Sequence, residues 1–577
     1  MTDITRTASV LTIVSTLFVS TGYAAPPDAG TLLNEQRQQP VGRLPDRLPK
    51  PEETKLERAP LVDSGVTVTV KRFRFSGYDN IVSESELQAL IVDSIGKQLG
   101  FAQLQDIVTN ITSYLRVKKG YMLARAYLPQ QDITEGVIEI VISVGRLDGN
   151  TGIKLDKAAR IKARVLRDMI DKVITPGKPL QTADIERAIL LMNDLPGIKA
   201  QATLEPGSAP GTTRVAVTAS EGALVSGSIT VDNHGDRYTG TWRGTGQASL
   251  NDALGLGDQL NLSFTGAEHQ FQGRASYSMP LGSSGLNGAI SYTGLYYEMG
   301  GDLKELNYNG RADTFGINFT YPLLRRRNTS IWAGTGFEYL LMTDEANNQK
   351  IKSRTIPVAN GSLSASFYDT FGGGAMTNAN VTFYGGNLDL SGVADAQTQD
   401  NLGPKSSGSF FRSTYNVARL QKVSQNISLY GLLRGQFAGC NLDSSQKFIL
   451  GGPTGVRAYP VGEASGDGGH ALTAEARIEL PFMPSWAATQ LIGFFDTGWV
   501  KLHQTAWPGS VTNRSGKNDY WLSGAGVGLN IGKDGLYALK ATYAHTVGNN
   551  DGRTLNDTDS DNRSDNNRFW LHAMIWF

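Results

Sequence analysis

Arg457 is the residue best placed for an electrostatic role. It lies in the segment 451–469, GGPTGVRAYPVGEASGDGG, which contains seven glycines and two prolines. Glycine and proline interrupt helices and strands, and a long loop with a charged tip usually has a function at that tip. Asp496 follows in the apolar, strand-like run 491–500, where a carboxylate is costly unless it faces water or a cation. The sequence therefore predicts that Arg457 contacts Asp496 across the inside of a barrel.

The sequence shows no catalytic or metal-binding pattern. Its six histidines are scattered, and phosphate-binding loops, nucleophile elbows and zinc motifs do not occur. The spaced glycines 524, 526 and 528 lack a βαβ context and are typical of a crowded barrel strand. The run 557–561 (DTDSD) begins like a calcium loop but lacks the glycine and the closing glutamate, so a solvated extracellular loop is favoured. The single cysteine, Cys440, is expected to pack rather than react. We therefore expect no enzyme activity, no cofactor and no metal.

The elements that must position Arg457 and Asp496 are strands. From residue 222 onward, runs of about ten residues alternate in polarity and are separated by turn residues, which suits transmembrane strands. The even number of runs, sixteen, fits a single-chain bacterial barrel. The sequence predicts strands at 223–233, 240–252, 257–267, 270–280, 285–298, 308–321, 327–343, 350–370, 373–387, 409–422, 424–437, 471–481, 488–501, 518–531, 535–547 and 567–577. A single cysteine, a formal charge of zero and no apolar helix-length run after the N-terminus give no sign of disulfides, nucleic-acid binding or a transmembrane helix.

The C-terminal strand ends on an aromatic residue. Phe577 and Ile575 share one face of the run 567–577, and Trp576 lies on the other. This ending resembles the signal by which outer-membrane barrels are recognised and inserted, which implies a barrel-assembly machinery as a partner. Because a closed barrel has no edge, this strand must pair with the first one, near 223–233. Asp232, in that first strand, is expected to be a turn or lumen residue.

The N-terminal part has a leader and a short helix. Residues 1–24 contain Arg6, an apolar core at 10–19 and small residues before the cleavage position, so they are predicted to be a secretory signal peptide. Within 25–39, an Asp followed by good helix formers predicts a helix from Asp28 to Gln39. Residues 40–65 are rich in proline and predict an extended linker. The alternative is a short helix that frays into a disordered linker.

Two similar units separate the linker from the barrel. Residues 66–147 read as strand, helix (83–95), helix (101–117) and two strands, and residues 148–221 repeat helices at 155–173 and 181–195 before two strands. A small sheet with an exposed edge can accept an extended chain as an added strand. The two units could therefore capture an unfolded polypeptide, although they could also only brace the barrel.

The tetrapeptide VRAY after KFILGGPTG, and the F-x-D-x-G strand that follows, resemble the two-partner secretion transporters (TpsB family). The resemblance covers nearly the whole chain. It implies that 66–147 and 148–221 are POTRA domains, that 25–39 plugs the lumen of the barrel 222–577, and that the loop 451–469 folds into that lumen. The residues carried over from the two motifs are Gly455, Val456, Arg457, Tyr459, Phe494, Asp496 and Gly498. Ala458 replaces the commoner glycine, which would strain a left-handed backbone there.

The resemblance implies a monomeric outer-membrane transporter with periplasmic N-terminal domains. It would bind an unfolded exoprotein within 66–221, at residues that the sequence does not identify, and pass it through the barrel to the cell surface. The exoprotein could be an adhesin, a haemolysin or a contact-dependent toxin. Two alternatives are a barrel-assembly factor that inserts other membrane proteins and a general porin.

Overall fold

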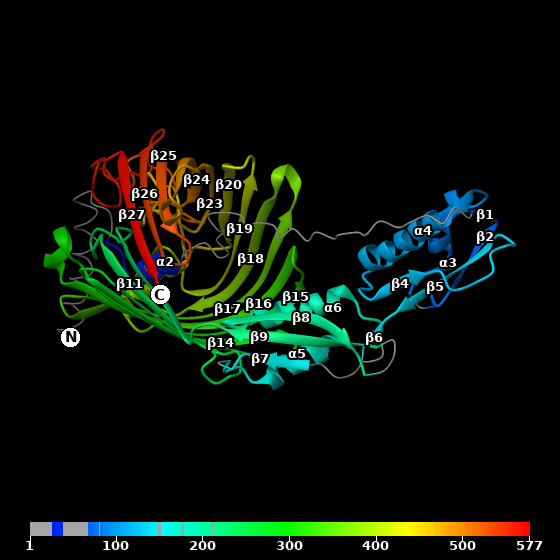
Figure 1. The fold of residues 1–577 in the computed structure, drawn as a ribbon. Coiled ribbons are helices and arrows are strands. Elements are labelled where there is room, and N and C mark those ends of the chain that lie inside the picture. The colour runs from blue at the N-terminus through cyan, green and yellow to red at the C-terminus, as the bar shows by residue number, and fades with distance from the viewer. Residues whose placement is uncertain are drawn as a thin grey trace.

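A computed structural model describes residues 26–37, 67–79, 81–147, 152–157, 159–174, 178–208 and 212–577. The expected signal peptide 1–24 and linker 40–65 lie outside these residues. Two small α/β units follow one another and lead into a large barrel, and a short helix, α2 (Ala29–Arg37), lies inside the barrel (Figure 1). In the part of the chain that is described, no helix is long and apolar enough to cross a bilayer.

The barrel is one closed antiparallel sheet. Its strands pair in the order β10 to β20, then β23 to β27, and β27 returns to β10. The predicted strands are confirmed; the largest shift is at the end of β15, expected at 321 and observed at Arg325. The strands are β10 (Val225–Asp232), β11 (Arg243–Asn251), β12 (Gln259–Gly266), β13 (Gln270–Pro280), β14 (Asn287–Glu298), β15 (Tyr308–Arg325), β16 (Thr329–Ala346), β17 (Gln349–Asp369), β18 (Ala375–Leu388), β19 (Gly408–Lys422), β20 (Ile427–Ala438), β23 (Gly468–Leu480), β24 (Ala488–Lys501), β25 (Asp519–Lys533), β26 (Tyr537–Thr546) and β27 (Asn567–Trp576).

The first and last strands close the barrel. Residues Ser228–Asp232 pair with His572–Trp576, and Gly227 and Phe577 exchange two backbone hydrogen bonds of 2.9 and 3.0 Å. Along the strands, large apolar side chains alternate with polar ones, and the apolar set is exposed on the outside of the barrel. An apolar exterior with every strand paired is what a hydrocarbon environment requires, because no water is present there to bond a free edge.

The first small unit has the predicted β-α-α-β-β order. Its elements are β2 (Arg72–Ser76), α3 (Glu84–Ile91), α4 (Phe101–Ser113), β4 (Ala124–Tyr127) and β5 (Val137–Val144), with β5 in the middle of the sheet. Ser83 and Glu86 form a capping box that begins α3. The apolar faces of both helices pack on the sheet in one buried cluster.

The second unit corrects one prediction. Its elements are β7 (Gly152–Leu155), α5 (Ala163–Val173), α6 (Thr182–Asn193), β8 (Ile198–Pro206) and β9 (Thr212–Glu221). The prediction that a helix begins at residue 155 was wrong. Gly152–Leu155 pair with β9 as a parallel strand, and the helix begins only at Ala163. Four residues are too few to reveal the period of two that identifies a strand.

The second unit touches the near end of the barrel, which is the end facing the small units. Arg325 pairs with Asp194 at 2.6 Å, and Arg187 donates to the carbonyl of Pro322 at 2.9 Å. The backbone N–H of Arg327 donates to Glu186 at 2.6 Å. The strand ends therefore hold this unit beside the barrel opening.

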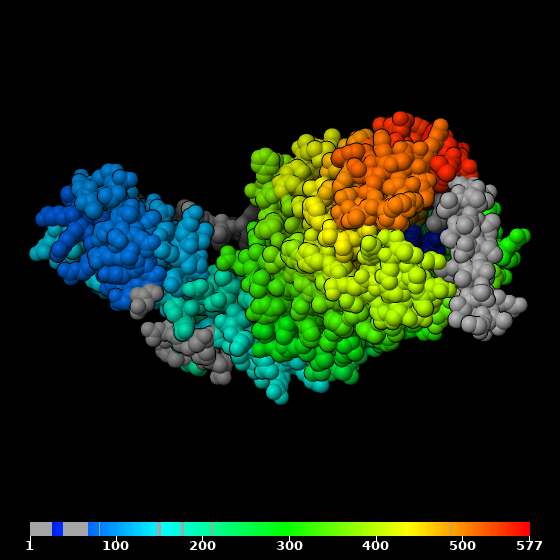
Figure 2. Space-filling model, turned by 180° about the vertical axis from the view of Figure 1, so that it is seen from behind, coloured from blue at the N-terminus to red at the C-terminus, as the bar shows by residue number. Residues whose placement is uncertain are grey.

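Helix α2 packs in the opposite, far half of the lumen. Ala29, Leu32 and Leu33 are fully buried against the inward faces of β14 to β17, including Leu340 and Ile356. In Figure 2, α2 shows as dark-blue atoms recessed among the barrel strands.

Barrel closure gives a direct prediction. A Cβ on Gly227 would lie 2.5 Å from both the Phe577 ring and the carbonyl oxygen of Gln247, whereas a Cβ on Gly246 would meet nothing within 4 Å. We expect Gly227→Val to lower the fraction of the protein that runs as folded barrel on unheated gels of outer membranes, and Gly246→Val to leave it unchanged. Equal folded fractions for the two variants would contradict this account of the closure.

Candidate functional site in the barrel lumen

The segment 451–469 belongs to a loop that leaves the far end of β20 and returns at β23. Within it, β21 (Phe448–Ile449) pairs with β22 (Ser465–Gly466). The N–H of Val456 donates to the carbonyl of Leu450 at 2.8 Å, and Val456 is fully buried. These bonds fold the loop on itself, so that its tip is a compact body rather than an extended strap.

Arg457, at this tip, reaches the wall of the barrel. Its Nε and Nη2 donate to the two carboxylate oxygens of Asp496 at 2.8 and 2.9 Å, and its backbone N–H donates to Oδ2 at 3.2 Å. Its Nη1 pairs with Glu475 at 2.8 Å, and its guanidinium carbon lies 3.5 Å from the centre of the Phe494 ring. Two-point contact with a carboxylate, together with stacking on a ring, uses the shape of arginine as well as its charge.

Glu475 and Arg477, on β23, extend this network. Arg477 pairs with Glu475 at 2.8 Å and lies over the Tyr430 ring at 4.2 Å. We call Arg457, Asp496, Glu475 and Arg477 the Arg457 cluster; its two cations and two carboxylates balance in formal charge. Glu475 and Arg477 were not predicted as site residues, although the period-two charges of the predicted strand 471–481 could have indicated them.

Small residues let the loop approach the wall. A Cβ on Gly455 would lie 2.8 Å from the guanidinium of Arg434 on β20, and one on Gly498 would lie 2.3 Å from the Leu450 side chain of the loop. Ala458 faces Gly524, where a Cβ would lie 2.5 Å from the Ala458 methyl. The strain expected at Ala458 is not seen, because the described left-handed non-glycine residue of the loop is Ala464, with φ of 58°.

The last strand also holds the loop tip. The indole N–H of Trp570, on β27, donates to the carbonyl of Arg457 at 2.7 Å, and Tyr459 is buried at 3% exposure in the same apolar cluster as Phe494. At the end of this strand, Ile575 and Phe577 are exposed on the lipid side at 58% and 66%. Trp576 is the last paired residue of β27.

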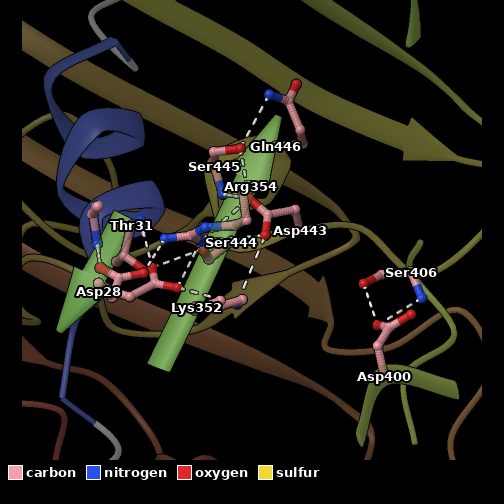
Figure 3. Close-up of polar contacts among 12 residues, drawn as sticks. Asp28, Thr31, Lys352, Arg354, Asp400, Ser406, Asp443, Ser444, Ser445 and Gln446 are labelled. Atoms are coloured by element: carbon pink, nitrogen blue, oxygen red, sulfur yellow. Dashed lines mark hydrogen bonds and ion pairs between the residues drawn. The ribbon is translucent and has the colours of Figure 1, made fainter. Parts of the chain in front are cut away.

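A second buried cation holds the start of α2 (Figure 3). Arg354, on β17, has no exposed side-chain surface and pairs with Asp28 at 2.7 Å, with Asp443 at 3.2 Å and with Asp344. Lys352 lies 3.4 Å from Asp28. We call Arg354, Lys352, Asp28, Asp344 and Asp443 the Arg354 cluster. Its four barrel residues were not predicted from the sequence.

Asp28 has two functions at once. Its Oδ1 accepts the Thr31 N–H at 2.9 Å, as the residue before a helix should, and also accepts the hydroxyl of Ser444 at 2.7 Å. Burial alone would raise the pKa of Asp28, but Arg354 and Lys352 outweigh burial and hold that pKa well below its usual range. Its ion pairs are therefore complete above the ordinary carboxyl pKa and weaken only in stronger acid.

Other residues singled out in the sequence have structural places. Asp232 lies in β10 and pairs with Arg243 at 2.9 Å. The run 557–561 was expected to be a solvated loop, and this is only partly right. Asp559 and Asp561 are buried, and both pair with Arg568. Cys440 is half-buried against an apolar cluster. Among the described residues no group of His, Cys, Asp and Glu is arranged to hold a metal ion.

Fold and lumen together define an outer-membrane barrel protein with POTRA-type units, and comparisons with known proteins agree. The model of the family "Haemolysin secretion/activation protein ShlB/FhaC/HecB" matches residues 211–531, and that of the "POTRA domain, ShlB-type" matches residues 68–145. The chain is 26% identical over 506 residues to the heme/hemopexin transporter protein HuxB of Haemophilus influenzae, spanning 86% of this chain and 85% of HuxB. It is 24% identical over 446 residues to the outer membrane transporter CdiB of Dickeya dadantii, spanning 74% of each.

Solved structures show the same fold. CdiB from Escherichia coli superposes with a TM-score of 0.69 at 21% identity, covering 99% of this chain and 98% of that one. CdiB from Acinetobacter baumannii superposes with a TM-score of 0.61 at 18% identity, covering 100% and 99%.

The chain belongs to the ShlB/FhaC/HecB family. It is an outer-membrane transporter of the two-partner secretion type, with its POTRA domains in the periplasm, and it moves an exoprotein through its barrel to the cell surface. The comparisons favour this function over that of a barrel-assembly factor. The family is one of transporters rather than enzymes. The near end of the barrel is accordingly periplasmic, and the far end is extracellular.

The Arg457 cluster should stabilise the folded loop. Asp496 is 1% exposed, so Arg457→Ala leaves its carboxylate buried without a cation and should lower the free energy of unfolding in detergent by about 3–5 kcal/mol. The control is Arg514→Ala, since Arg514 is 64% exposed beside Asp557 and an exposed pair contributes about 0–1 kcal/mol. Urea titration followed by tryptophan fluorescence measures both variants. Equal losses would contradict a stabilising role for the cluster.

Proposed function

We propose that this transporter exports one long, unfolded exoprotein, and that α2, lying beside the fixed loop 451–469, closes the pore between export events. The observation that supports the proposal is the position of α2. A barrel of this strand number is wide enough for an aqueous channel. Yet Ala29 donates its N–H to Asp344, 315 residues away, at 2.9 Å inside the lumen. A pore filled by a separate short helix can be opened by removing that helix.

The relatives supply one further candidate for the exoprotein. HuxB carries the name of a heme/hemopexin transporter, and its similarity spans most of this chain. Two-partner export of a haem- or hemopexin-binding exoprotein therefore joins the adhesin, the haemolysin and the contact-dependent toxin as a candidate cargo.

We propose β8 as a capture edge for the exoprotein. β8 pairs with β9 on one side only among the described strands. On the other side, the Asn193 side chain exchanges two hydrogen bonds of 2.9 Å with the backbone of Ala200. Outward-facing groups repeat every second residue in an antiparallel pair. Ala202 and Leu204 therefore also direct their N–H and C=O away from β9, where an extended chain can bond them.

Ala202→Pro removes one of these outward donors while the ladder to β9 stays intact. We expect export of the cognate exoprotein to fall at least about tenfold, which corresponds to a loss of only about 1.4 kcal/mol of binding. Ala202→Val keeps the N–H and should export normally. Surface exoprotein, normalised to folded barrel, is the measurement. Unchanged export by Ala202→Pro would exclude this edge.

Loss of the whole chain tests the function itself. Its deletion should abolish surface display of that exoprotein and leave the other outer-membrane proteins at normal abundance. A general loss of outer-membrane proteins would instead indicate an assembly factor.

We propose that the Arg457 cluster keeps the loop 451–469 in place while α2 leaves. Its contacts to β23 and β24 involve neither α2 nor the Arg354 cluster. Taking Asp28 away leaves Arg354 and Lys352 with Asp344 and Asp443, which is a balanced set of charges. The wall therefore does not retain a buried net charge when the helix departs.

Displacing α2 should open the pore. In Leu32→Asp/Leu33→Asp, two carboxylates replace side chains that have at most 1% exposure, and burying unpaired carboxylates is strongly unfavourable. We expect the fraction of time that the full-length protein conducts in planar bilayers to rise at least about tenfold, which corresponds to about 1.4 kcal/mol. Gln36→Asp, on the same helix but at a partly exposed side chain near its C-terminal end, is the control. A closed pore in the double variant would refute the plug.

A further inference from the structure

The apolar face of α2 packs against the extracellular segments as well as against the barrel wall. One continuous buried cluster contains Ala29, Leu32 and Leu33 of the helix together with inward-facing residues of the barrel wall and residues of the extracellular segments. Its wall members are Leu295, Tyr297, Tyr308, Ala312, Leu340, Met342, Ile356, Val358, Leu388 and Phe410. Its members from extracellular segments and the strand end beside them are Tyr238, Met299, Leu303, Ala346, Leu390 and Leu442.

The extracellular members come from different connections. Tyr238 follows β10, Met299 and Leu303 follow β14, Leu390 follows β18 and Leu442 follows β20. Each connection is anchored to its own pair of strands, but their buried side chains meet in one cluster with the helix. A cluster formed from four loops and an inserted helix depends on the helix for part of its volume, because buried cores are close-packed.

Polar contacts tie α2 to one of these connections in particular. The Asn34 side chain donates to the carbonyls of Ser444 and Lys447 at 3.2 and 2.6 Å. Gly30 lies so close to this segment that a Cβ would be 2.4 Å from the Ser444 hydroxyl and 2.9 Å from the Ser445 N–H. The helix therefore contacts the base of the same loop whose tip carries Arg457.

We infer that α2 is a part of the extracellular closure as well as an obstruction in the pore, so that its departure toward the periplasm also loosens the extracellular segments packed on it. This inference rests on the proposed plug and adds its regulation: displacement from one side of the membrane opens the exit on the other. The exoprotein then needs no separate signal at the cell surface.

Loss of two fully buried leucines explains the coupling. When they leave, the side chains around them must either border an empty space or move together, and both weaken the packing of the loops. Water that enters the pore then reaches Tyr238, Leu390 and Leu442, whose burial the helix had completed. The Arg457 cluster shares no residue with this cluster, so the loop tip stays in place.

Cys440 provides a natural reporter of this event. It is the single cysteine of the chain, it follows β20 at the extracellular end, and it packs against the cluster. Burial raises the pKa of its thiol, so little reactive thiolate is present while the cluster is intact. Loosening the cluster exposes the sulfur and lowers its pKa, and both changes accelerate reaction with a maleimide.

The experiment labels the full-length protein in intact cells with a membrane-impermeant maleimide. We expect Leu32→Asp/Leu33→Asp to raise the labelling rate of Cys440 at least tenfold over the native chain. Asn34→Asp places a carboxylate against two carbonyl oxygens and should raise the rate at least threefold. Gln36→Asp should match the native chain, and Cys440→Ser gives the background. A Cys440→Ser/Ser515→Cys chain, with its thiol on the separate loop after β24, should label at one rate with or without the helix substitutions.

Conductance of the same variants separates the outcomes. If variants open the pore but label Cys440 at the native rate, the coupling between α2 and the extracellular segments is refuted. The proposal that α2 plugs the pore would still stand. Variants that change neither conductance nor labelling would refute the plug, and the inference with it. Faster labelling of Ser515→Cys by the same factor would show general unfolding and would also overturn the inference.

Discussion

Pairing of every backbone group in the lipid-embedded wall is the constraint on which the rest of this structure depends. A sheet in hydrocarbon has to close, and here the bonds between Gly227 and Phe577 complete it. Closing sixteen strands creates an interior that the wall's own side chains are too short to fill. The chain therefore supplies material for the lumen from two distant places, a helix that precedes the POTRA domains and a long loop between β20 and β23. The segments that fill the lumen and the path for transport both follow from the number of strands in the closed sheet.

Both inserted segments are held by a buried arginine, but the two arrangements differ. Arg457 is carried by the inserted loop and meets carboxylates on the wall, whereas Arg354 is carried by the wall and meets a carboxylate on the inserted helix. Arg457 also stacks on Phe494 and is covered by the last strand. The helix is held by three apolar side chains, by Asn34, by the ion pairs of Asp28, and by an ion pair of 3.2 Å between Arg37 and Glu338. The loop therefore brings its own cation to the wall, whereas the wall keeps its cation when the helix departs.

Patterns within single segments made the fold predictable from the sequence. Strands with alternating polarity can be located because one face meets lipid, and the terminal Phe577 marks the closing strand. Arg457 and Asp496 could be singled out because Arg457 is the one cation of the segment 451–469 and Asp496 is the one charge of the apolar run 491–500. The Arg354 cluster could not be found in this way, because Lys352 and Arg354 are ordinary inward-facing residues of a long strand until Asp28 is brought to them from the other end of the chain. β7 was missed because its pairing partner β9, rather than its own four residues, makes it a strand.

The sequence separations around α2 also dictate an order of events in biosynthesis. The helix is translated before either POTRA domain, but Asp28 bonds Arg354 and Ser444, which follow it by 326 and 416 residues. Contacts between such distant positions form late, because the intervening chain must first be ordered. A helix that is translated early is thus among the last elements to find its place. A truncated product that ends before residue 443 cannot complete those bonds. A channel closed by α2 therefore forms only in a chain that has been translated beyond Ser444.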